Sequence, residues 1–299
     1  MSFAGSMKTI VVATGLDGRS EAALEYARKL ASGYGARIVL AYGSDPLDYA
    51  VVDGVPGQVL DGMTERARAA LDEMAADLLR EGIHSHSEIR QGAVVQMLVD
   101  IARQYQAGLI VVGTRGREGA GPIAVGAIAE ELVRKAPCPV FAVAADWNAG
   151  EFRPVPGGPV LLAMERNDAT HAAADAACSL AQIFKRTLLV VHARGSAEVS
   201  AILNPDTPKL EEFGIKPGPE LPVRLIVKDG SPVDAVTQAI EQYKPSILVA
   251  GVKRKSDSPG PHGTAFALLA NSRVPVLCVP AEGGSLVHDL VERVSVEVK

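Results

Sequence analysis

The feature that most constrains the fold is an internal duplication, because blocks of sequence recur in the same order in the second part of the chain. The stretch "KTIVVATGLDGRSEAALEYARKLASGYGARIVLAYGS" corresponds to "GPVLLAMERNDATHAAADAACSLAQIFKRTLLVVHAR", and both read as strand, turn, amphipathic helix and strand. A tandem repeat of one folding unit explains this order, and 299 residues suffice for two domains of ordinary size. The paired blocks are 8–44 with 158–194, 89–113 with 226–251, and 134–143 with 271–280.

The domain organisation follows from the duplication. The stretch "AADWNAGEFRPVPGG" between the copies is polar and rich in Gly and Pro, as linkers are. The second copy carries several prolines and glycines over 195–221, where the first has a long helical pattern, so we expect at most a short helix there. We therefore expect a first domain at 1–146, a linker at 147–158, a degenerate second domain at 159–281 and a C-terminal tail at 282–299.

Within each copy, short β-branched runs alternate with helical patterns. The runs "TIVVAT", "RIVLAY" and "LIVVG" are nearly all apolar, which indicates strands buried on both faces of a parallel sheet. Strand–helix alternation with right-handed crossovers predicts an α/β, doubly wound fold. Helices are expected over 20–34 and 61–82, and the second has an apolar stripe of Leu71, Met74, Ala75, Leu78 and Leu79.

Composition narrows the classes of function. The formal net charge of −5 disfavours an electrostatic grip on nucleic acid or an anionic membrane. No apolar run approaches the roughly 20 residues that span a bilayer, and "MSFAGSMKTIVVATG" lacks a signal-peptide pattern. Three scattered cysteines predict buried thiols rather than a disulfide framework or a zinc site. The sequence thus predicts a soluble cytoplasmic protein with neither a nucleic-acid nor a membrane partner.

A glycine-rich connection follows the buried run "LIVVG". Gly113, Gly116 and Gly126 are separated by two and nine residues, and Gly126 and Ala127 open the helix "GAIAEELVRKA". Glycine lets backbone N–H groups approach a ligand closely, and a helix N-terminus suits phosphate. A phosphate chain across this loop would explain the glycines. A flexible connection without a ligand is the alternative, because the Walker sequence Gly-Lys-Ser/Thr is absent.

The pattern Gly-x2-Gly-x9-Gly, followed by a helix and "APCPVFAV", resembles the universal stress protein (UspA-like) family over 8–144 and 158–280. The resemblance implies two five-stranded parallel sheets of strand order 3-2-1-4-5. It also implies that "CPVFAV" and "VPVLCV", which end the two halves, pair as an intramolecular pseudo-dimer, with a homodimer of the chain left open. In ATP-binding members, adenine and ribose lie near the ends of strands 1 and 2, and the triphosphate lies on the glycine loop.

By this resemblance, the first half holds an adenine nucleotide (ATP, ADP or AMP), with Mg²⁺ as an accompanying ion. Two departures weaken the match, because Gly15 stands where the family usually has an acidic residue and Ala127 where Ser or Thr usually follows the third glycine. The implied nucleotide-contacting residues are Ala13, Thr14, Gly15, Tyr42, Val112, Gly113, Thr114, Gly116, Gly126 and Ala127.

The second half departs further from the family pattern. It keeps Gly251 and has Glu165 at the acidic position, but Arg254 replaces the second glycine. Its loop "VKRKSDSPGPH" is either a solvated basic loop or an anion site that uses Lys253, Arg254 or Lys255. The first half is therefore the expected nucleotide site.

No catalytic motif accompanies the glycine loop. The stretch "HSHSE" places His84, His86 and Glu88 on one face of a strand, where a polar solvent face is favoured over a metal site. The sequence predicts a stress-response, nucleotide-binding module without catalytic or metal-binding residues. The alternatives are a ligand-independent scaffold for protein–protein association and, third, a nucleotide-dependent transferase or hydrolase.

Overall fold

A computed structural model describes residues 2–16, 18–44, 57–114, 127–144, 157–164, 169–194, 221–253, 263–272 and 274–281. The first half contains α1 (Phe3–Ser6), β1 (Thr9–Ala13), α2 (Gly18–Tyr34), β2 (Arg37–Ser44), α4 (Gly57–Arg80), β3 (Ser85–Gln91), α5 (Val94–Gln104), β4 (Leu109–Thr114), α6 (Ala127–Lys135) and β5 (Val140–Ala144). The second half contains β6 (Val160–Met164), α7 (Ala169–Ile183), β7 (Leu188–Arg194), β8 (Val223–Asp229), α9 (Pro232–Tyr243), β9 (Ile247–Val252), α10 (Thr264–Asn271) and β10 (Val276–Pro280).

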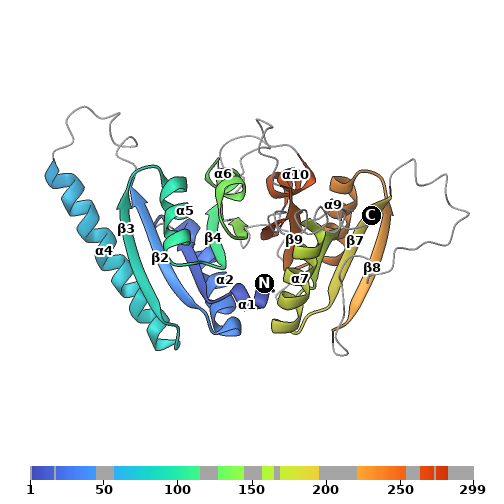
Figure 1. Cartoon of the computed structure of the whole chain (residues 1–299), viewed down its shortest axis with the longest axis horizontal. Helices are drawn as coiled ribbons and strands as arrows, with labels where there is room; N and C mark the ends of the chain where they lie inside the picture. Colours follow the sequence, from blue (N-terminus) through green and yellow to red (C-terminus); the bar gives the residue numbers. More distant parts are fainter. Residues whose placement is uncertain are drawn as a thin grey trace, which may run out of the picture.

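The strands form one ten-stranded sheet in the order β3-β2-β1-β4-β5-β10-β9-β6-β7-β8. Each half contributes five parallel strands in the order 3-2-1-4-5, which confirms the doubly wound α/β fold expected from the sequence. Figure 1 shows the halves side by side, with α4 and β3 at one end of the sheet and β8 at the other. In the part of the chain that the structure describes, no helix is long and apolar enough to cross a membrane.

Helices cover both faces of the central strands of the sheet. Since successive side chains of a strand point to opposite faces, Ile10 and Val12 pack into one core layer and Val11 into the other. The first layer also contains residues of α1, α2, α4 and α7, and the second contains residues of α5, α6, α9 and α10. Each layer includes buried residues from both halves, so the halves share a continuous core.

The halves meet edge to edge through β5 and β10. These strands pair in antiparallel fashion with Phe141 opposite Leu277, which confirms the pairing expected across the pseudo-twofold axis. On one face of this junction, the guanidinium carbon of Arg134 in α6 lies 4.9 Å from the ring centre of Phe266 in α10. Figure 1 shows these two helices next to each other at the centre of the molecule. Because β5 and β10 pair with each other, β3 and β8 are the outer strands of the sheet.

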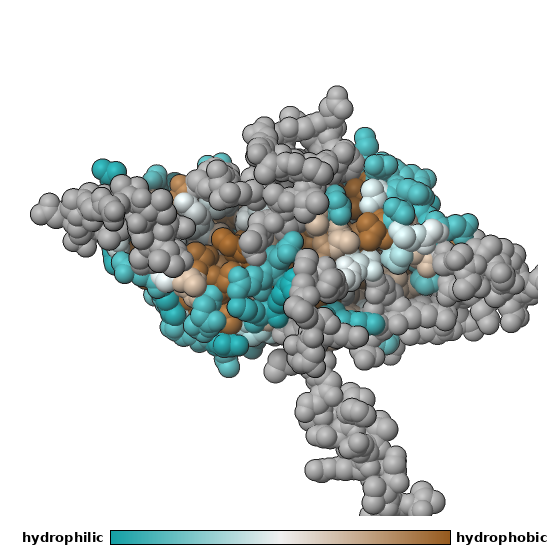
Figure 2. All heavy atoms as spheres, turned by 90° about the horizontal axis from the view of Figure 1, so that it is seen from above, coloured by the Kyte–Doolittle hydropathy of each residue, from teal (hydrophilic) through white to brown (hydrophobic). Residues whose placement is uncertain are grey.

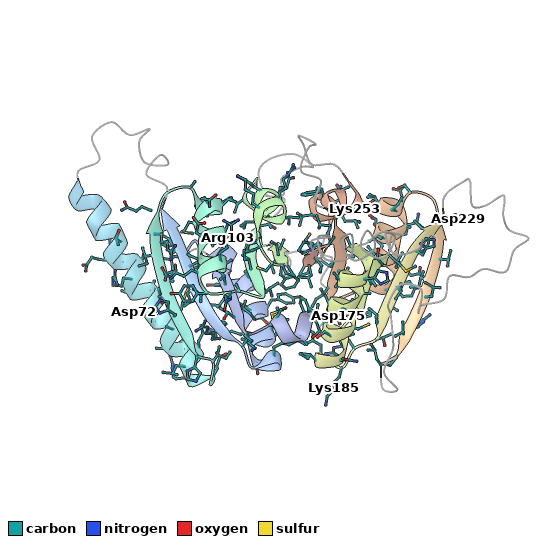
Figure 3. The ribbon with its side chains drawn as sticks, viewed as in Figure 1. Asp72, Arg103, Asp175, Lys185, Asp229 and Lys253 are labelled. Atoms are coloured by element: carbon teal, nitrogen blue, oxygen red, sulfur yellow. The ribbon has the colours of Figure 1, made fainter. Side chains whose placement is uncertain are left out.

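The residues before the first repeat also belong to the junction between the halves. The ring of Phe3 is 6% exposed and packs edge to face on Tyr34 of α2, with 6.0 Å between the ring centres. The N–H of Phe3 donates a 2.6 Å hydrogen bond to Oδ2 of Asp175 in α7, which Figure 3 labels at the boundary beside α1. The hydroxyls of Tyr34 and Ser179 are 2.8 Å apart across the same boundary. Helix α1 therefore ties α2 of one half to α7 of the other, a contact that the sequence did not predict.

Two expectations about buried side chains are corrected by the structure. Leu71 and Leu78 are fully buried on α4 as expected, but Leu79 is 61% exposed because the apolar stripe of this helix is narrower than the sequence suggested. Cys138 and Cys278 are buried, and burial raises the pKa of the Cys278 thiol to about 12, whereas Cys178 is only half-buried. The expectation of at most a short helix in the second half falls on 195–220, outside the described residues.

Candidate functional site

The carboxyl ends of β1 and β4 meet where the strand order reverses. Strands β2 and β3 lie on one side of β1, and β4 and β5 lie on the other. The register pairs Ala13 of β1 with Val112 of β4. Gly15 and Thr114, each two residues further along the chain, therefore lie together at the carboxyl ends of the strands. Open α/β sheets bind ligands at such a reversal point. Figure 2 looks down on this edge and shows apolar surface in two areas, one over each half.

The turn after β1 is held by buried hydroxyl groups. Oγ1 of Thr14 donates a 3.2 Å hydrogen bond to Oγ of Ser20 in the first turn of α2, and it accepts a 3.2 Å bond from the N–H of Leu16. Thr14 and Ser20 are 7% and 5% exposed. Gly15, between the bonded residues, is exposed at the end of the strand. The hydroxyl of Thr14, an expected nucleotide contact, is therefore engaged within the protein.

Leu16 adopts an unusual backbone conformation in this turn. Its φ is 56°, in the left-handed region that costs an L-residue with a Cβ about 1–2 kcal/mol. The other non-glycine residues with positive φ in the described part of the chain are Gln106, Lys185 and Lys244, each within two residues of a helix C-terminus. A left-handed residue is common at that position but not after a strand. The strained turn thus lies at the reversal point of the sheet.

On the β4 side, the described residues end where the glycine loop begins. Val112 is buried, and Gly113 and Thr114 are half-buried, with Oγ1 of Thr114 placed 3.5 Å from the carbonyl oxygen of Val143 in β5. Helix α6 begins at Ala127, as the glycine pattern predicted. Gly116 and Gly126 lie outside the described residues, so their expected roles remain predictions.

Two residues lie at the end of β2: Tyr42, whose expected role as a nucleotide contact stays a prediction, and Gly43. Tyr42 is half-buried and packs against the core layer that contains α2 and α4. The next residue, Gly43, allows α5 to approach β2 closely, because a Cβ at Gly43 would lie 2.8 Å from Sδ of Met97. Sequence reasoning missed Gly43, although a glycine at the end of an apolar strand indicates a close approach of another element.

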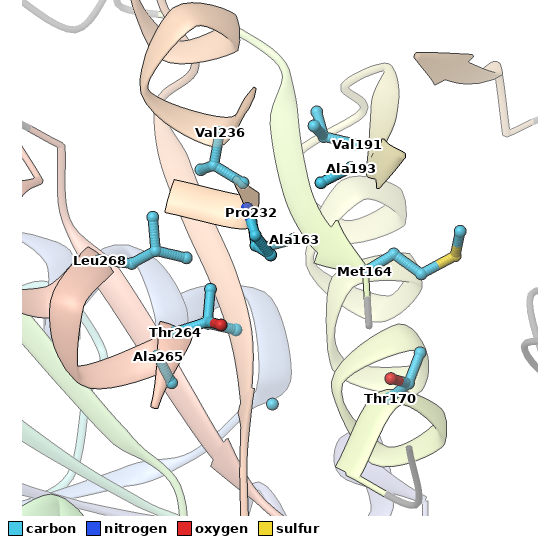
Figure 4. A pocket seen from close by; sticks show the side chains of 12 residues that line it. Ala163, Met164, Thr170, Val191, Ala193, Pro232, Val236, Thr264, Ala265 and Leu268 are labelled. Carbon is cyan, nitrogen blue, oxygen red and sulfur yellow. The ribbon is translucent and has the colours of Figure 1, made fainter. Parts of the chain in front are cut away.

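In the second half, a small cavity opens at the corresponding edge, shown in Figure 4. Its volume of about 20 Å³ is close to the room that one water molecule needs. None of the side chains that line it is charged, and its hydroxyls belong to Thr170, which is buried, and to Thr264. The lining residues are Ala163, Met164, Thr170, Val191, Ala193, Pro232, Val236, Ala250, Gly251, Thr264, Ala265 and Leu268.

Backbone packing limits the space beside this cavity. A Cβ at Gly251, the retained glycine of the second half, would lie 2.7 Å from the carbonyl oxygen of Ala169 at the start of α7. Lys253 is exposed just beyond the end of β9, near the label in Figure 3. Arg254, Lys255 and Glu165 lie outside the described residues, so the choice between a solvated loop and an anion site stays open.

The residues of "HSHSE" take part in a polar cluster on β3. Nε2 of His86 lies 3.5 Å from Oε1 of Glu88, and the carboxylate of Glu88 also accepts hydrogen bonds from Tyr105 and Arg90. Burial raises the pKa of Glu88, but these hydrogen bonds and the charge of Arg90 outweigh burial, and the net effect lowers the pKa. Among the described residues, no group of three His, Cys, Asp or Glu side chains could hold a metal ion.

The fold defines a class of protein: two doubly wound α/β units that join through their terminal strands, each with a reversal of strand order at the carboxyl ends of its strands. The profile of the "Universal stress protein family" matches residues 7–144. "Universal stress protein A homolog 2" of Coxiella burnetii is 30% identical over 143 residues, which are 46% of this chain and 94% of that protein. The chain therefore belongs to the universal stress protein family.

Two further comparisons concern a second relative in sequence and a similar fold. A universal stress protein of Methanocaldococcus jannaschii is 28% identical over 141 residues, which are 46% of this chain and 81% of that protein. The crystal structure of a universal stress protein from Archaeoglobus fulgidus DSM 4304 matches 92% of this chain and 98% of its own, with a TM-score of 0.72 and 18% identity. The latter extends the similarity in fold over both halves.

Proposed function

We propose that this chain is a cytoplasmic stress-response protein that binds one adenine nucleotide in its first half and catalyses no dedicated reaction. The observation that carries the proposal is the juxtaposition of Ala13–Gly15 and Val112–Thr114 at the strand-order reversal, with the N-terminus of α6 next along the chain. In such a crevice, backbone N–H groups and the positive end of a helix dipole favour phosphate. Membership of the universal stress protein family supports the same assignment.

The proposed site comprises the ten residues expected from the sequence, with different roles for the two sides of the crevice. On the β1 side, the absence of a side chain at Gly15 exposes backbone to the ligand. On the β4 side, Gly113 leads into the loop that contains Gly116 and Gly126, which we assign to the phosphates together with Ala127. ATP, ADP and AMP all fit this assignment, with Mg²⁺ accompanying a triphosphate.

The choice of the first half is supported by its set of motif glycines, Gly113, Gly116 and Gly126, because Arg254 replaces the second of these glycines in the second half. The same observation favours a second candidate function for the second half alone, in which residues 159–281 act as a ligand-independent scaffold for the domain at 1–146 or for another protein.

Isothermal titration calorimetry of the full chain with ATP, ADP and AMP, with and without Mg²⁺, tests the proposal. The expected result is one nucleotide per chain, and mass spectrometry of the freshly purified protein should detect an adenine nucleotide. Absence of heat with all three ligands would favour the scaffold. Two equivalent sites per chain would contradict the choice of half, and multiple turnovers of labelled ATP would contradict a purely binding role.

A further inference from the structure

The turn between β1 and α2 contains an internal arrangement that a loop without a function would not need. A leucine adopts a left-handed conformation three residues after the end of a buried strand, at the reversal point of the sheet. Strain of this kind persists where the surrounding structure holds it, and it concentrates at binding and catalytic sites.

The hydroxyl of Thr14 holds the turn from inside the protein. As acceptor it binds the N–H of Leu16 two residues on, which closes a short turn, and as donor it is anchored to Ser20 on α2. The backbone N–H of Thr14 donates to the carbonyl of Ala41, which keeps this residue in register with β2. The side chain of Leu16 packs against the core, so the turn is fixed at both ends.

The turn presents Gly15, which is exposed just beyond the carboxyl end of β1, beside the end of β4. A glycine has many conformations, so a ligand that contacts its backbone must order it unless neighbours have already done so. Thr14 and Leu16 flank Gly15 and restrict it before any ligand arrives.

The second half lacks this arrangement. The repeat aligns Thr170 with Ser20, and the hydroxyl of Thr170 is buried in the same way, but Met164 occupies the position of Thr14. The thioether of Met164 cannot donate a hydrogen bond to a hydroxyl, and its side chain packs in the core layer of α7, pointing away from α10 in Figure 4. The hydroxyl pair is thus confined to the half in which we place the nucleotide.

We propose that Thr14 is a positioning residue for the nucleotide, which acts by holding Leu16 in the left-handed turn so that the backbone of Gly15 is ordered for the ligand. This inference rests on the proposed function. It changes the role of Thr14 from a ligand contact, as the sequence suggested, to a group that touches only protein and sets the geometry of its neighbour.

The test compares Thr14→Val, Thr14→Ser and Thr9→Val in the full chain. Thr9→Val is a matched control, because Thr9 is 3% exposed on the same strand and its Oγ1 accepts a 3.0 Å hydrogen bond from Nε of Arg37, at the opposite end of β1. By calorimetry, Thr14→Val should bind ATP about tenfold more weakly, equal to about 1.4 kcal/mol. Thr14→Ser should restore most of the affinity, and Thr9→Val should bind as the wild type does.

Hydrogen exchange supplies a readout that does not depend on a ligand. Exchange at the Leu16 amide should be faster in Thr14→Val, but not in Thr9→Val, because only the former loses the acceptor of that amide. Thr14→Val loses two hydrogen bonds and Thr9→Val loses one, so both variants should lower Tm by a few degrees, Thr14→Val by more. Loss of affinity in Thr14→Val alone would separate positioning from general destabilisation.

Three outcomes would overturn the inference. If the wild type binds a nucleotide and Thr14→Val binds it equally well, the positioning role is refuted and the proposed function is left intact. Equal loss of affinity in Thr9→Val, or in Thr14→Ser, would show that stability or side-chain volume matters rather than the hydroxyl. Absence of nucleotide binding by the wild type would refute the proposed function and this inference with it.

Discussion

Replacing Phe3 by alanine tests whether the N-terminal segment fastens the two halves to each other. The ring of Phe3 is 6% exposed and lies edge to face on Tyr34 of the first half, while its N–H donates to Asp175 of the second half. Phe3→Ala removes the ring and leaves the backbone donor in place. The variant therefore measures the apolar part of this contact.

The magnitude follows from the burial of the ring. Truncation of a buried phenylalanine to alanine destabilises a protein by about 3–5 kcal/mol. The chain near residue 3 can shift and partly close the space that is left, so we take the lower value of about 3 kcal/mol. For a protein of this size, a loss of 1 kcal/mol lowers Tm by about 2 °C, so we expect a decrease of about 6 °C.

Differential scanning calorimetry measures the decrease directly. Leu79→Ala is the matched control, because it also truncates a large apolar side chain, but one that is 61% exposed. Surface truncations of this kind usually change stability by less than about 0.5 kcal/mol. If Phe3→Ala lowered Tm no more than Leu79→Ala does, α1 would not contribute to the junction as we describe.

Three further predictions concern alkaline pH, a close backbone contact and the glycine loop. Burial foremost, and then the charge of Asp175, raise the pKa of Tyr34 from 10 to about 12, although its hydrogen bond with Ser179 lowers it. Because the unfolded state loses this proton first, the contribution of Tyr34 to stability is complete below pH 10 and is lost as pH rises to about 12. The free energy of unfolding, measured with urea, should therefore decrease more steeply with pH over that range in the wild type than in Tyr34→Phe. Gly108→Ala should destabilise the protein by about 2 kcal/mol or more in the same assay, because its Cβ would lie 2.1 Å from the carbonyl oxygen of Ser6. A variant as stable as the wild type would contradict this packing. Gly116→Val should abolish nucleotide binding and Arg254→Gln should leave it unchanged by calorimetry, and the reverse pattern would place the site in the second half.

The architecture could be predicted from the sequence because its causes are local and repeated. Runs such as "TIVVAT" and "LIVVG" are apolar at every position, which only strands covered on both faces need. The duplication then presents the same order of strands twice. The apolar strand that ends each half required a partner strand. The two terminal strands pair with each other, with Phe141 opposite Leu277.

The contacts of α1 could not be predicted in this way. A helix of four residues, Phe3–Ser6, has no periodicity to recognise, and the partner of its N–H is 172 residues away. The sequence also did not show which of two adjacent leucines is buried. Leu78 and Leu79 differ only in which of them lies on the side of α4 that faces the sheet. The motif supplies candidate residues for the site, but the sequence does not show that the hydroxyl of Thr14 points to Ser20.

The shared core also bears on how one half can hold a strained turn. Core side chains of both halves occupy the same two layers, so neither half is expected to unfold without disturbing the other. In the second half, the backbone packs closely where a Cβ at Gly251 would lie 2.7 Å from the carbonyl oxygen of Ala169. In the first half, the left-handed Leu16 lowers stability and persists only if the rest of the structure supports it. Since the two units are fused through β5 and β10, close packing in one can offset strain in the other. On this reasoning, the second half stabilises the turn on which the proposed nucleotide site depends.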